Sequence, residues 1–334
     1  MNPKQRRLRY FAYMLAMSFP AFAVGQSPPA ELPRIGLLAW SSCDEPSYAR
    51  GRGEFGSFRR GLDELGYRPG KTVSFECRSA GERYDGLAAA AAELARLPVA
   101  VIVTNSQPAG RAAHEATKTV PIVTVVSGDP VAAGLARSLG QPGGNLTGVS
   151  YYATELTAKR LELLRELNPQ VARVDILANP DVSYLPFEED TKHAASRLGL
   201  TLRTHQVRDR AGLAGAFARM KAEGAQAVFV LPDVMFAWSA EQIAALALEH
   251  RLPTMAWGSW FAEVGCLMAY SGDYGGMGRR LASYVDRILK GARPGELPIE
   301  QPTAFALSIN LKTAKALGID VAPSLLARAD RVIE

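Results

Sequence analysis

The sequence predicts an α/β protein with two lobes that face each other across a ligand cleft. Short runs rich in β-branched residues alternate with Ala- and Leu-rich stretches of helical length from residue 34 onward. This alternation is typical of βαβ units around parallel sheets. The alternation forms two similar series, and the 334 residues, 48% of them hydrophobic, are enough for two cores.

The first series is expected to hold five strands joined by four helices. Each strand is a short apolar run with β-branched residues, and the stretch at 86–95 is alanine-rich, which suits a helix packed closely on a sheet. The strands are predicted at 34–40, 72–77, 99–104, 122–126 and 146–150, and the helices at about 54–65, 84–96, 108–118 and 130–139. The turn cluster Gln141 to Asn145 precedes the last strand.

The second series repeats the pattern and adds a long helix and a tail. Strands are predicted at 174–178, 202–206, 227–231, 254–257 and 267–270, and helices at 155–167, 187–198, 211–222, 240–250 and 274–290. A Pro/Gly-rich connection at 291–302 then leads to a strand at 305–310 and helical turns.

The first 25 residues predict a secretory signal peptide. Residues 1–9 are cationic, residues 10–24 form an apolar stretch of 15, and Ala21-Phe22-Ala23 is a small-x-small cleavage site, so we expect cleavage after Ala23 or Gly25. The alternative, an N-terminal membrane anchor, needs about 20 apolar residues. No later run approaches 18 uninterrupted apolar residues, so we expect no membrane anchor and a periplasmic protein exported by a Sec-type signal.

The charge distribution argues against a nucleic-acid partner. The formal net charge is +5, but Lys4, Arg6, Arg7 and Arg9 lie in the leader. Without them 34 basic residues face 33 acidic ones, which removes the main support for a basic binding patch.

The three cysteines, Cys43, Cys77 and Cys266, lack the spacing of a metal site, and we expect no metal. Cys43 and Cys77 follow or end neighbouring strands of the predicted sheet. A disulfide between them would be worth about 3 to 4 kcal/mol in an oxidising compartment. Three free or buried thiols are an equally good interpretation, so the pairing stays open.

Motifs for cofactors and catalysis are weak or missing. Residues 51–56 match G-x-G-x-x-G, and Glu76 lies twenty residues beyond the last of these glycines, Gly56. Ten residues, however, separate the first glycine from the predicted strand, whereas a dinucleotide site needs it directly after the strand. No hydrolase motif occurs and the four histidines form no evident pairing, so we expect neither a cofactor nor an enzyme.

Small polar and aromatic residues recur just past the predicted strand ends, where ligands of open α/β sheets bind. Helices beginning there can hold a carboxylate, and Asp129 or Asp233 can take an ammonium group. The predicted ligand-binding residues from this pattern are Ser41, Ser42, Asn105, Ser127, Asp129, Tyr151, Asn179, Asp233, Trp257 and Ser271. The alternative is that these hydroxyl and carboxyl groups are ordinary helix N-caps and that the aromatic residues fill the lobe interiors.

Long co-linear segments of the chain resemble the periplasmic solute-binding proteins of ABC importers, in the subfamily that includes binders of tryptophan and other aromatic amino acids. The resemblance runs from about 33 to 334 and is carried by 58–104, 120–150 (VPIVTVVSGDPVAAGLARSLGQPGGNLTGVS), 155–169 (ELTAKRLELLRELNP) and 301–334. It implies a type I periplasmic-binding fold of two Rossmann-like lobes joined by three crossovers. The implied N-terminal lobe is 33–150 with about 273–300, and the implied C-terminal lobe is 151–272 with about 301–334.

The resemblance also implies a function and partners. Such proteins are not enzymes, work as monomers without a cofactor, and deliver a small solute, here an amino acid or related carboxylate, to an ABC permease and its ATPase. The family's site positions fall best on Thr104, Asn105, Asp129, Tyr151, Asn179 and Asp233. The long loop 41–53, the aromatic stretch 257–260, Cys266 and Ser271 depart from the family pattern, so the ligand itself stays open. A ligand-sensing module, or an exported enzyme using the same cleft, remains as the alternative.

Overall fold

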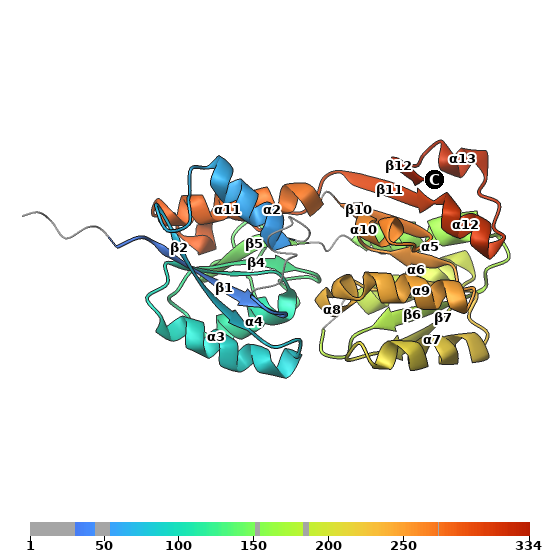
Figure 1. Cartoon of the computed structure of the whole chain (residues 1–334), viewed down its shortest axis with the longest axis horizontal. Helices are drawn as coiled ribbons and strands as arrows, with labels where there is room; N and C mark the ends of the chain where they lie inside the picture. The colour runs from blue at the N-terminus through green and yellow to red at the C-terminus, as the bar shows by residue number, and fades with distance from the viewer. Residues whose placement is uncertain (1–30, 44–53, 151–153, 183–186, 273) are drawn as a thin grey trace, which may run out of the picture. The chain divides into compact units, whose positions relative to one another are not determined.

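The computed structural model describes residues 31–43, 54–150, 154–182, 187–272 and 274–334. Its first sheet has five parallel strands in the order β2-β1-β3-β4-β5 (Figure 1). The strands are β1 (Arg34–Ala39), β2 (Ser74–Ser79), β3 (Val101–Thr104), β4 (Ile122–Val126) and β5 (Leu146–Ser150). This order places the carboxyl ends of β1 and β3 side by side, since Leu38 pairs with Thr104.

Helices cover both faces of this sheet, because successive strand residues point to opposite faces. Ile35 and Leu37 belong to one apolar cluster with α2 (Glu54–Glu64) and α11 (Tyr274–Leu289). Leu38 belongs to a second cluster with α3 (Leu87–Arg96) and α4 (Gln107–Ala116). A short 3₁₀ turn, η2 (Tyr84–Gly86), leads into α3.

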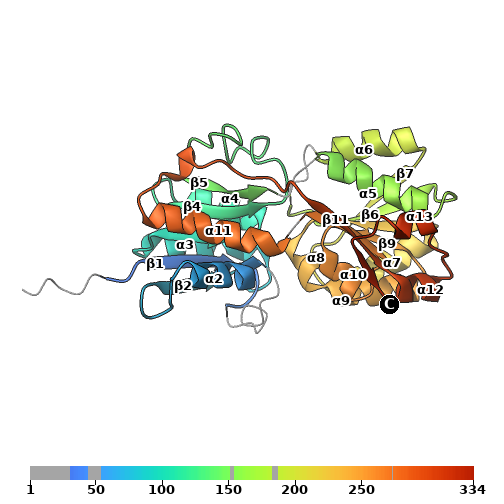
Figure 2. The same ribbon diagram turned by 90° about the horizontal axis from the view of Figure 1, so that it is seen from above.

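The second sheet has seven strands in the order β12-β11-β10-β9-β8-β6-β7 (Figure 2). All neighbouring strands are parallel except β10 and β11. The strands are β6 (Arg173–Ala178), β7 (Thr201–Gln206), β8 (Ala227–Val230), β9 (Thr254–Ala256), β10 (Met268–Gly272), β11 (Phe305–Asn310) and β12 (Arg331–Ile333). The associated helices are α5 (Thr154–Leu167), α6 (Phe187–Leu198), α7 (Gly212–Ala222), α8 (Val234–Trp238), α9 (Ala240–Glu249), α10 (Ser259–Glu263), α12 (Leu311–Leu317) and α13 (Pro323–Leu326).

The chain runs from one sheet to the other and back. It leaves the first sheet after β5, and helix α11 returns to that sheet although it follows β10 of the second one. The segment after η3 (Pro294–Glu296) then runs beside β5, where the backbone N–H of Ser150 donates to the carbonyl of Glu300 at 2.8 Å. Residues Leu32–Glu334 form one compact unit that holds both sheets, and the predicted α/β class is confirmed. The residue-level lobe boundaries stay a prediction.

Helices α2 and α11 approach so closely that only glycine fits between them. A Cβ atom on Gly278 would lie 1.9 Å from Ser57 Oγ and 2.5 Å from the backbone nitrogen of Phe58. A Cβ atom on Gly61 would lie 2.8 Å from that of Ala282. This contact fastens the late helix α11 to the first sheet.

The structure differs from the expectations about the elements at five points. Residues 130–139 form turns instead of a helix, because Gly134 adopts a left-handed φ of 70° and Asp129 caps a local turn. Helices α8 and α10 and strand β12 were not predicted, since five or three residues are too few to show a period. Ser271 lies inside β10 and pairs with Ala306, so it does not follow a strand.

The sequence predicted no membrane anchor and a signal peptide at the start of the chain. None of the helices in the described part of the chain combines the length and the hydropathy that a membrane crossing needs. The predicted signal peptide, residues 1–25, lies outside the described residues.

Candidate functional site

Buried polar groups without partners gather where the first sheet ends. Trp40 and Ser41 directly follow β1, and Asn105 directly follows the neighbouring strand β3. Their side chains are 1%, 1% and 8% exposed. Trp40 Nε1, Ser41 Oγ and Asn105 Oδ1 have no hydrogen-bond partner among the described residues. A buried polar atom without a partner costs about 1 to 3 kcal/mol, so this edge of the sheet is suited to a ligand that supplies the missing bonds.

In the second sheet a buried carboxylate lies past the carboxyl end of a strand, as the polar groups of the first sheet do. Asp233 lies three residues past β8 and caps helix α8, its Oδ1 accepting from the backbone N–H of Phe236 at 3.0 Å. Its Oδ2 accepts from the hydroxyl of Tyr84 at 2.6 Å. Asn179, which directly follows β6 and is fully buried, lowers the pKa of Asp233.

The charge of Asp233 depends mainly on its burial, because no cation among the described residues pairs with it. Its side chain is 4% exposed, and this desolvation raises the pKa of Asp233 to about 6 against the downward effect of its hydrogen bonds. None of the ion pairs between described residues includes Asp233. A buried carboxylate surrounded by neutral donors is a favourable place for a ligand cation.

Aromatic rings cluster where strand β9 of the second sheet ends. Trp257 directly follows β9 and is 3% exposed. Its ring meets that of Trp260 edge-on, with centroids 4.9 Å apart and an interplanar angle of 88°, and Phe261 lies 5.9 Å away. This cluster offers a large apolar surface at the end of the second sheet.

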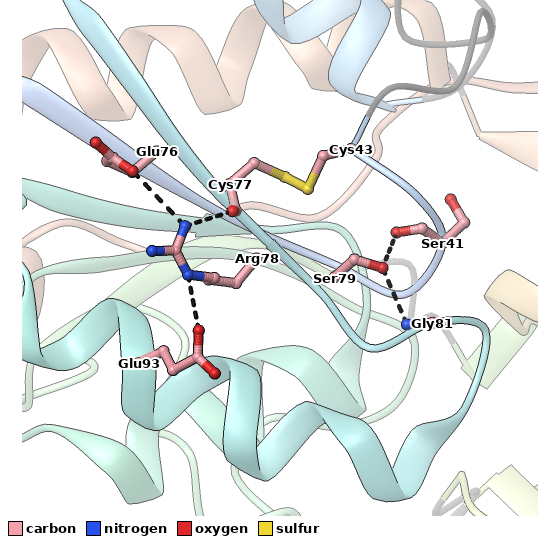
Figure 3. The surroundings of a disulfide bond; sticks show 8 residues. All are labelled: Ser41, Cys43, Glu76, Cys77, Arg78, Ser79, Gly81 and Glu93. Atoms are coloured by element: carbon pink, nitrogen blue, oxygen red, sulfur yellow. Dashed lines mark hydrogen bonds and ion pairs between the residues drawn. A yellow bond between two sulfur atoms is a disulfide. The ribbon is translucent and has the colours of Figure 1, made fainter.

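A disulfide fixes the segment that carries Ser41, which settles the question left open by the sequence. Cys43 and Cys77 are bonded, and they link the segment after β1 to strand β2 (Figure 3). Ser79 Oγ also donates to the carbonyl of Ser41 at 2.6 Å. Cys266 is free and buried, and burial raises the pKa of its thiol to about 12. A thiol with that pKa stays protonated and unreactive at neutral pH.

Five further predicted site residues are described by the structure, and their part in ligand binding stays a prediction. Ser42 is exposed, and the Thr104 hydroxyl bonds to that of Thr124 at 2.6 Å. Ser127 donates to Gln107 Oε1 at 3.3 Å. Asp129 accepts from the backbone N–H of Val131 at 2.7 Å, which is a local cap. Ser271 lies inside β10, and Tyr151, also predicted, lies outside the described residues.

The sequence analysis missed two residues of this region. Tyr84 was predicted only as part of a helix, and Trp40 only as the last residue of a strand. Trp40 could have been found, because it ends a predicted strand and ligands of open α/β sheets bind at that end. Tyr84 could not, because its contact with Asp233 spans 149 residues of sequence.

A second cluster of ionisable groups lies away from these strand ends. Donor atoms of Asp175, His205 and Glu223 lie within 4.8 Å of one another, a set that could hold a metal ion. His205 Nε2 already bonds to Asp175 Oδ2 at 2.6 Å, and Arg203 pairs with Glu223. These groups therefore satisfy one another without an ion.

The chain is similar to known binding proteins along nearly its whole length. Residues 52–333 match the family model described as ABC transporter substrate binding protein. A tyrosine-binding protein of Clostridioides difficile (strain R20291) is 25% identical over 268 residues, which cover 78% of this chain and 75% of that protein.

Solved structures agree with this relationship. An ABC domain from Streptococcus pneumoniae in complex with L-Trp aligns with a TM-score of 0.81 and 26% identity over 90% of this chain and 100% of that one. A conserved domain protein from Vibrio cholerae aligns with a TM-score of 0.82 and 27% identity over the same shares. These full-length alignments confirm the two-lobed, type I periplasmic-binding fold. Because the family model matches well over half of the sequence, the chain belongs to the ABC transporter substrate-binding protein family.

Proposed function

We propose that this protein captures an α-amino acid with an aromatic side chain and delivers it to an ABC permease. One observation carries the proposal. Among the described residues, buried polar groups without partners at the end of the first sheet accompany a buried carboxylate without a cation at the end of the second. An α-amino acid supplies both a carboxylate and an ammonium group.

Each part of such a ligand has a matching group in the protein. The Trp40 indole N–H and the Ser41 hydroxyl are donors for the ligand carboxylate, and the Asn105 carbonyl accepts from the ammonium group. Asp233 supplies the opposite charge for the ammonium. Trp257 and Trp260 supply the apolar surface on which an aromatic side chain packs.

The relatives support the class of ligand. The similar protein of Clostridioides difficile is named a tyrosine-binding protein, and the similar Streptococcus pneumoniae structure holds L-Trp. A Kd near 1 μM corresponds to about 8 kcal/mol. A few charge-assisted hydrogen bonds and one or two ring contacts supply that amount once the two lobes close on the ligand.

The disulfide supports a location outside the cytoplasm. Disulfides persist in oxidising compartments such as the bacterial periplasm. Together with the predicted signal peptide, the bond between Cys43 and Cys77 favours a periplasmic protein that meets its permease at the membrane surface.

Isothermal titration calorimetry with L-tryptophan and L-tyrosine tests the proposal. We expect micromolar binding of at least one of them by wild type. We expect a loss of at least tenfold in Asp233→Asn, since a neutral amide cannot pair with the ammonium. The matched control is Asp286→Asn, because the Asp286 carboxylate likewise accepts from a tyrosine hydroxyl, that of Tyr67 at 2.9 Å, and is not a predicted site residue. Equal losses in both variants, or no binding by wild type, would refute the assignment.

A further inference from the structure

The segment from Ser79 to Tyr84, which we call the 79–84 turn, is held rigidly beside the end of β1. The backbone N–H of Glu82 donates to the carbonyl of Trp40 at 2.8 Å, and that of Gly81 donates to Ser79 Oγ at 2.9 Å. Ser79 in turn bonds to Ser41, and the disulfide ties the preceding strand to the same segment (Figure 3). The turn is therefore part of the rigid frame of the first sheet.

The turn contains an unfavourable backbone conformation at a residue that is not glycine. Gly81 and Glu82 both have a φ of 64°, and Glu82 is one of two described non-glycine residues with a positive φ. Such conformations persist where the surrounding structure requires them, often at functional sites. The Glu82 carboxylate contacts Arg210, which lies between β7 of the second sheet and helix α7, with Oε1 3.5 Å from Nη2.

Tyr84 makes a second and more buried contact with the second sheet. Its hydroxyl donates to Asp233 Oδ2 at 2.6 Å, and its ring lies 6.0 Å from that of Trp40. Tyr84 also packs against all three apolar clusters of the protein, two of which hold residues of the second sheet. The Tyr84 side chain therefore contacts both Trp40, whose indole N–H has no partner among the described residues, and the buried carboxylate of Asp233.

We propose that the 79–84 turn is a latch between the two lobes, in which Tyr84 is the positioning residue that holds Asp233 toward the ligand and Glu82 adds an ion pair with Arg210. The latch rests on the proposed function, because it acts on the carboxylate assigned to the ligand ammonium. It forms only when the ends of the two sheets approach. It therefore slows ligand release and contributes little to the encounter step.

The distribution of hydrogen bonds on Asp233 supports this role. Tyr84 occupies Oδ2, and the N–H of Phe236 occupies Oδ1, so the carboxylate is fixed from two sides. An ionised carboxylate has about four acceptor sites, and these two hydrogen bonds use one on each oxygen. Tyr84 and the ligand therefore bind Asp233 together.

The test is stopped-flow measurement of L-tryptophan binding and release by Tyr84→Phe. We expect the dissociation rate to rise about tenfold and the association rate to stay within twofold, since a hydrogen bond to a charged group is lost only from the closed complex. The matched control is Tyr67→Phe, because the Tyr67 hydroxyl donates to Asp286 at 2.9 Å in the first lobe, away from the latch. Equal dissociation rates for the two variants would overturn the latch. Tighter binding by Tyr84→Phe would also overturn it and would mean that Tyr84 competes with the ligand.

The ion pair between Glu82 and Arg210 can be tested separately from the Tyr84 hydrogen bond. Glu82→Gly keeps the left-handed backbone and removes the charge, and we expect release to accelerate about twofold, because both partners are more than 40% exposed. Glu82→Lys places a second cation beside Arg210, and we expect faster release than in Glu82→Gly. Identical release by wild type and both variants would remove the ion pair from the latch.

Small-angle scattering separates failure of the latch from failure of the ligand assignment. If wild type binds neither L-tryptophan nor L-tyrosine, the ligand class is wrong. The latch is then tested by the radius of gyration of the ligand-free protein. A larger radius in the Tyr84→Phe/Arg210→Glu double variant than in wild type supports the latch, and equal radii overturn it.

Discussion

Asp233 illustrates how one side chain can serve binding at the expense of stability. It is buried among hydrogen-bond donors that carry no positive charge, and its ordinary pKa of 3.8 rises to about 6. Folding therefore favours the protonated form. Near neutral pH the empty protein carries a buried negative charge that a ligand cation would stabilise.

The stability of the protein should reveal this cost. A folded-state pKa above the unfolded one means that the stabilising effect of protonation is complete below pH 3.8 and is lost as the pH rises through 6. Asp233→Asn cannot ionise, so we expect its free energy of unfolding to exceed that of wild type at pH 8 by up to about 3 kcal/mol. At pH 4 the two should be nearly equal. Urea unfolding at both pH values checks this, and a difference that does not depend on pH would contradict it.

The sequence predicted the residues at strand ends better than the contacts across the fold. Asn105, Asn179 and Asp233 are found by counting past predicted strands, because parallel strands end at one edge of a sheet. The same rule also places Asp129 past β4, although Gly134 stops the expected helix there, and it misplaced Ser271, where the strand continues. Tyr84 follows from no local pattern, since only the tertiary fold brings it to Asp233.

At the scale of elements, long and strongly patterned segments were predictable and short ones were not. Strands β4, β5 and β11 and helix α6 have the expected bounds. Helices α8 and α10 and strand β12 have five residues or fewer, and tertiary packing decides such elements. The strand alternation also predicted sheets covered on both faces, but the antiparallel pairing of β10 with β11 depends on a tail that returns after α11.

The contact between α2 and α11 predicts a strong effect of a single methyl group. Gly278→Ala would place its Cβ 1.9 Å from Ser57 Oγ, so the helices must separate. We expect the free energy of unfolding to fall by about 1 to 3 kcal/mol, measured by chemical denaturation. The control is Gly215→Ala on the exposed face of α7, which should raise stability by about 0.5 to 1 kcal/mol. Equal effects of the two changes would contradict the packing argument.

The disulfide should stabilise the first sheet measurably. It closes a loop with a sequence separation of 34, and we expect the Cys43→Ser/Cys77→Ser double variant to lose about 3 to 4 kcal/mol of unfolding free energy. Denaturation with and without reductant measures the loss. Reductant should bring wild type to the level of the double variant and leave the double variant unchanged. If reductant changed the stability of the double variant, that change would have to come from Cys266, the cysteine that remains.

At the scale of the whole molecule, family membership and export make a joint prediction. A binding protein that serves a permease must lie outside the cytoplasm, and the leader should be removed on the way. We expect intact mass spectrometry of protein from the periplasm to show a chain that begins at Val24 or Gln26. Protein of full-length mass in that fraction would contradict the predicted cleavage.

The position of helix α11 has a consequence for the synthesis of the chain. The first sheet is complete by residue 150, but the helix that covers one of its faces begins only at Tyr274. A growing chain therefore exposes the apolar residues of that face until most of the second sheet has been made. We expect early folding intermediates of this lobe to be incompletely packed and to fold slowly. The contacts that complete the lobe join residues more than 200 positions apart, as in the ion pair of Glu64 with Arg279. A fragment that stops after β5 would lack the α11 side chains that pack on this face with α2, so we expect it to be less stable than the complete lobe.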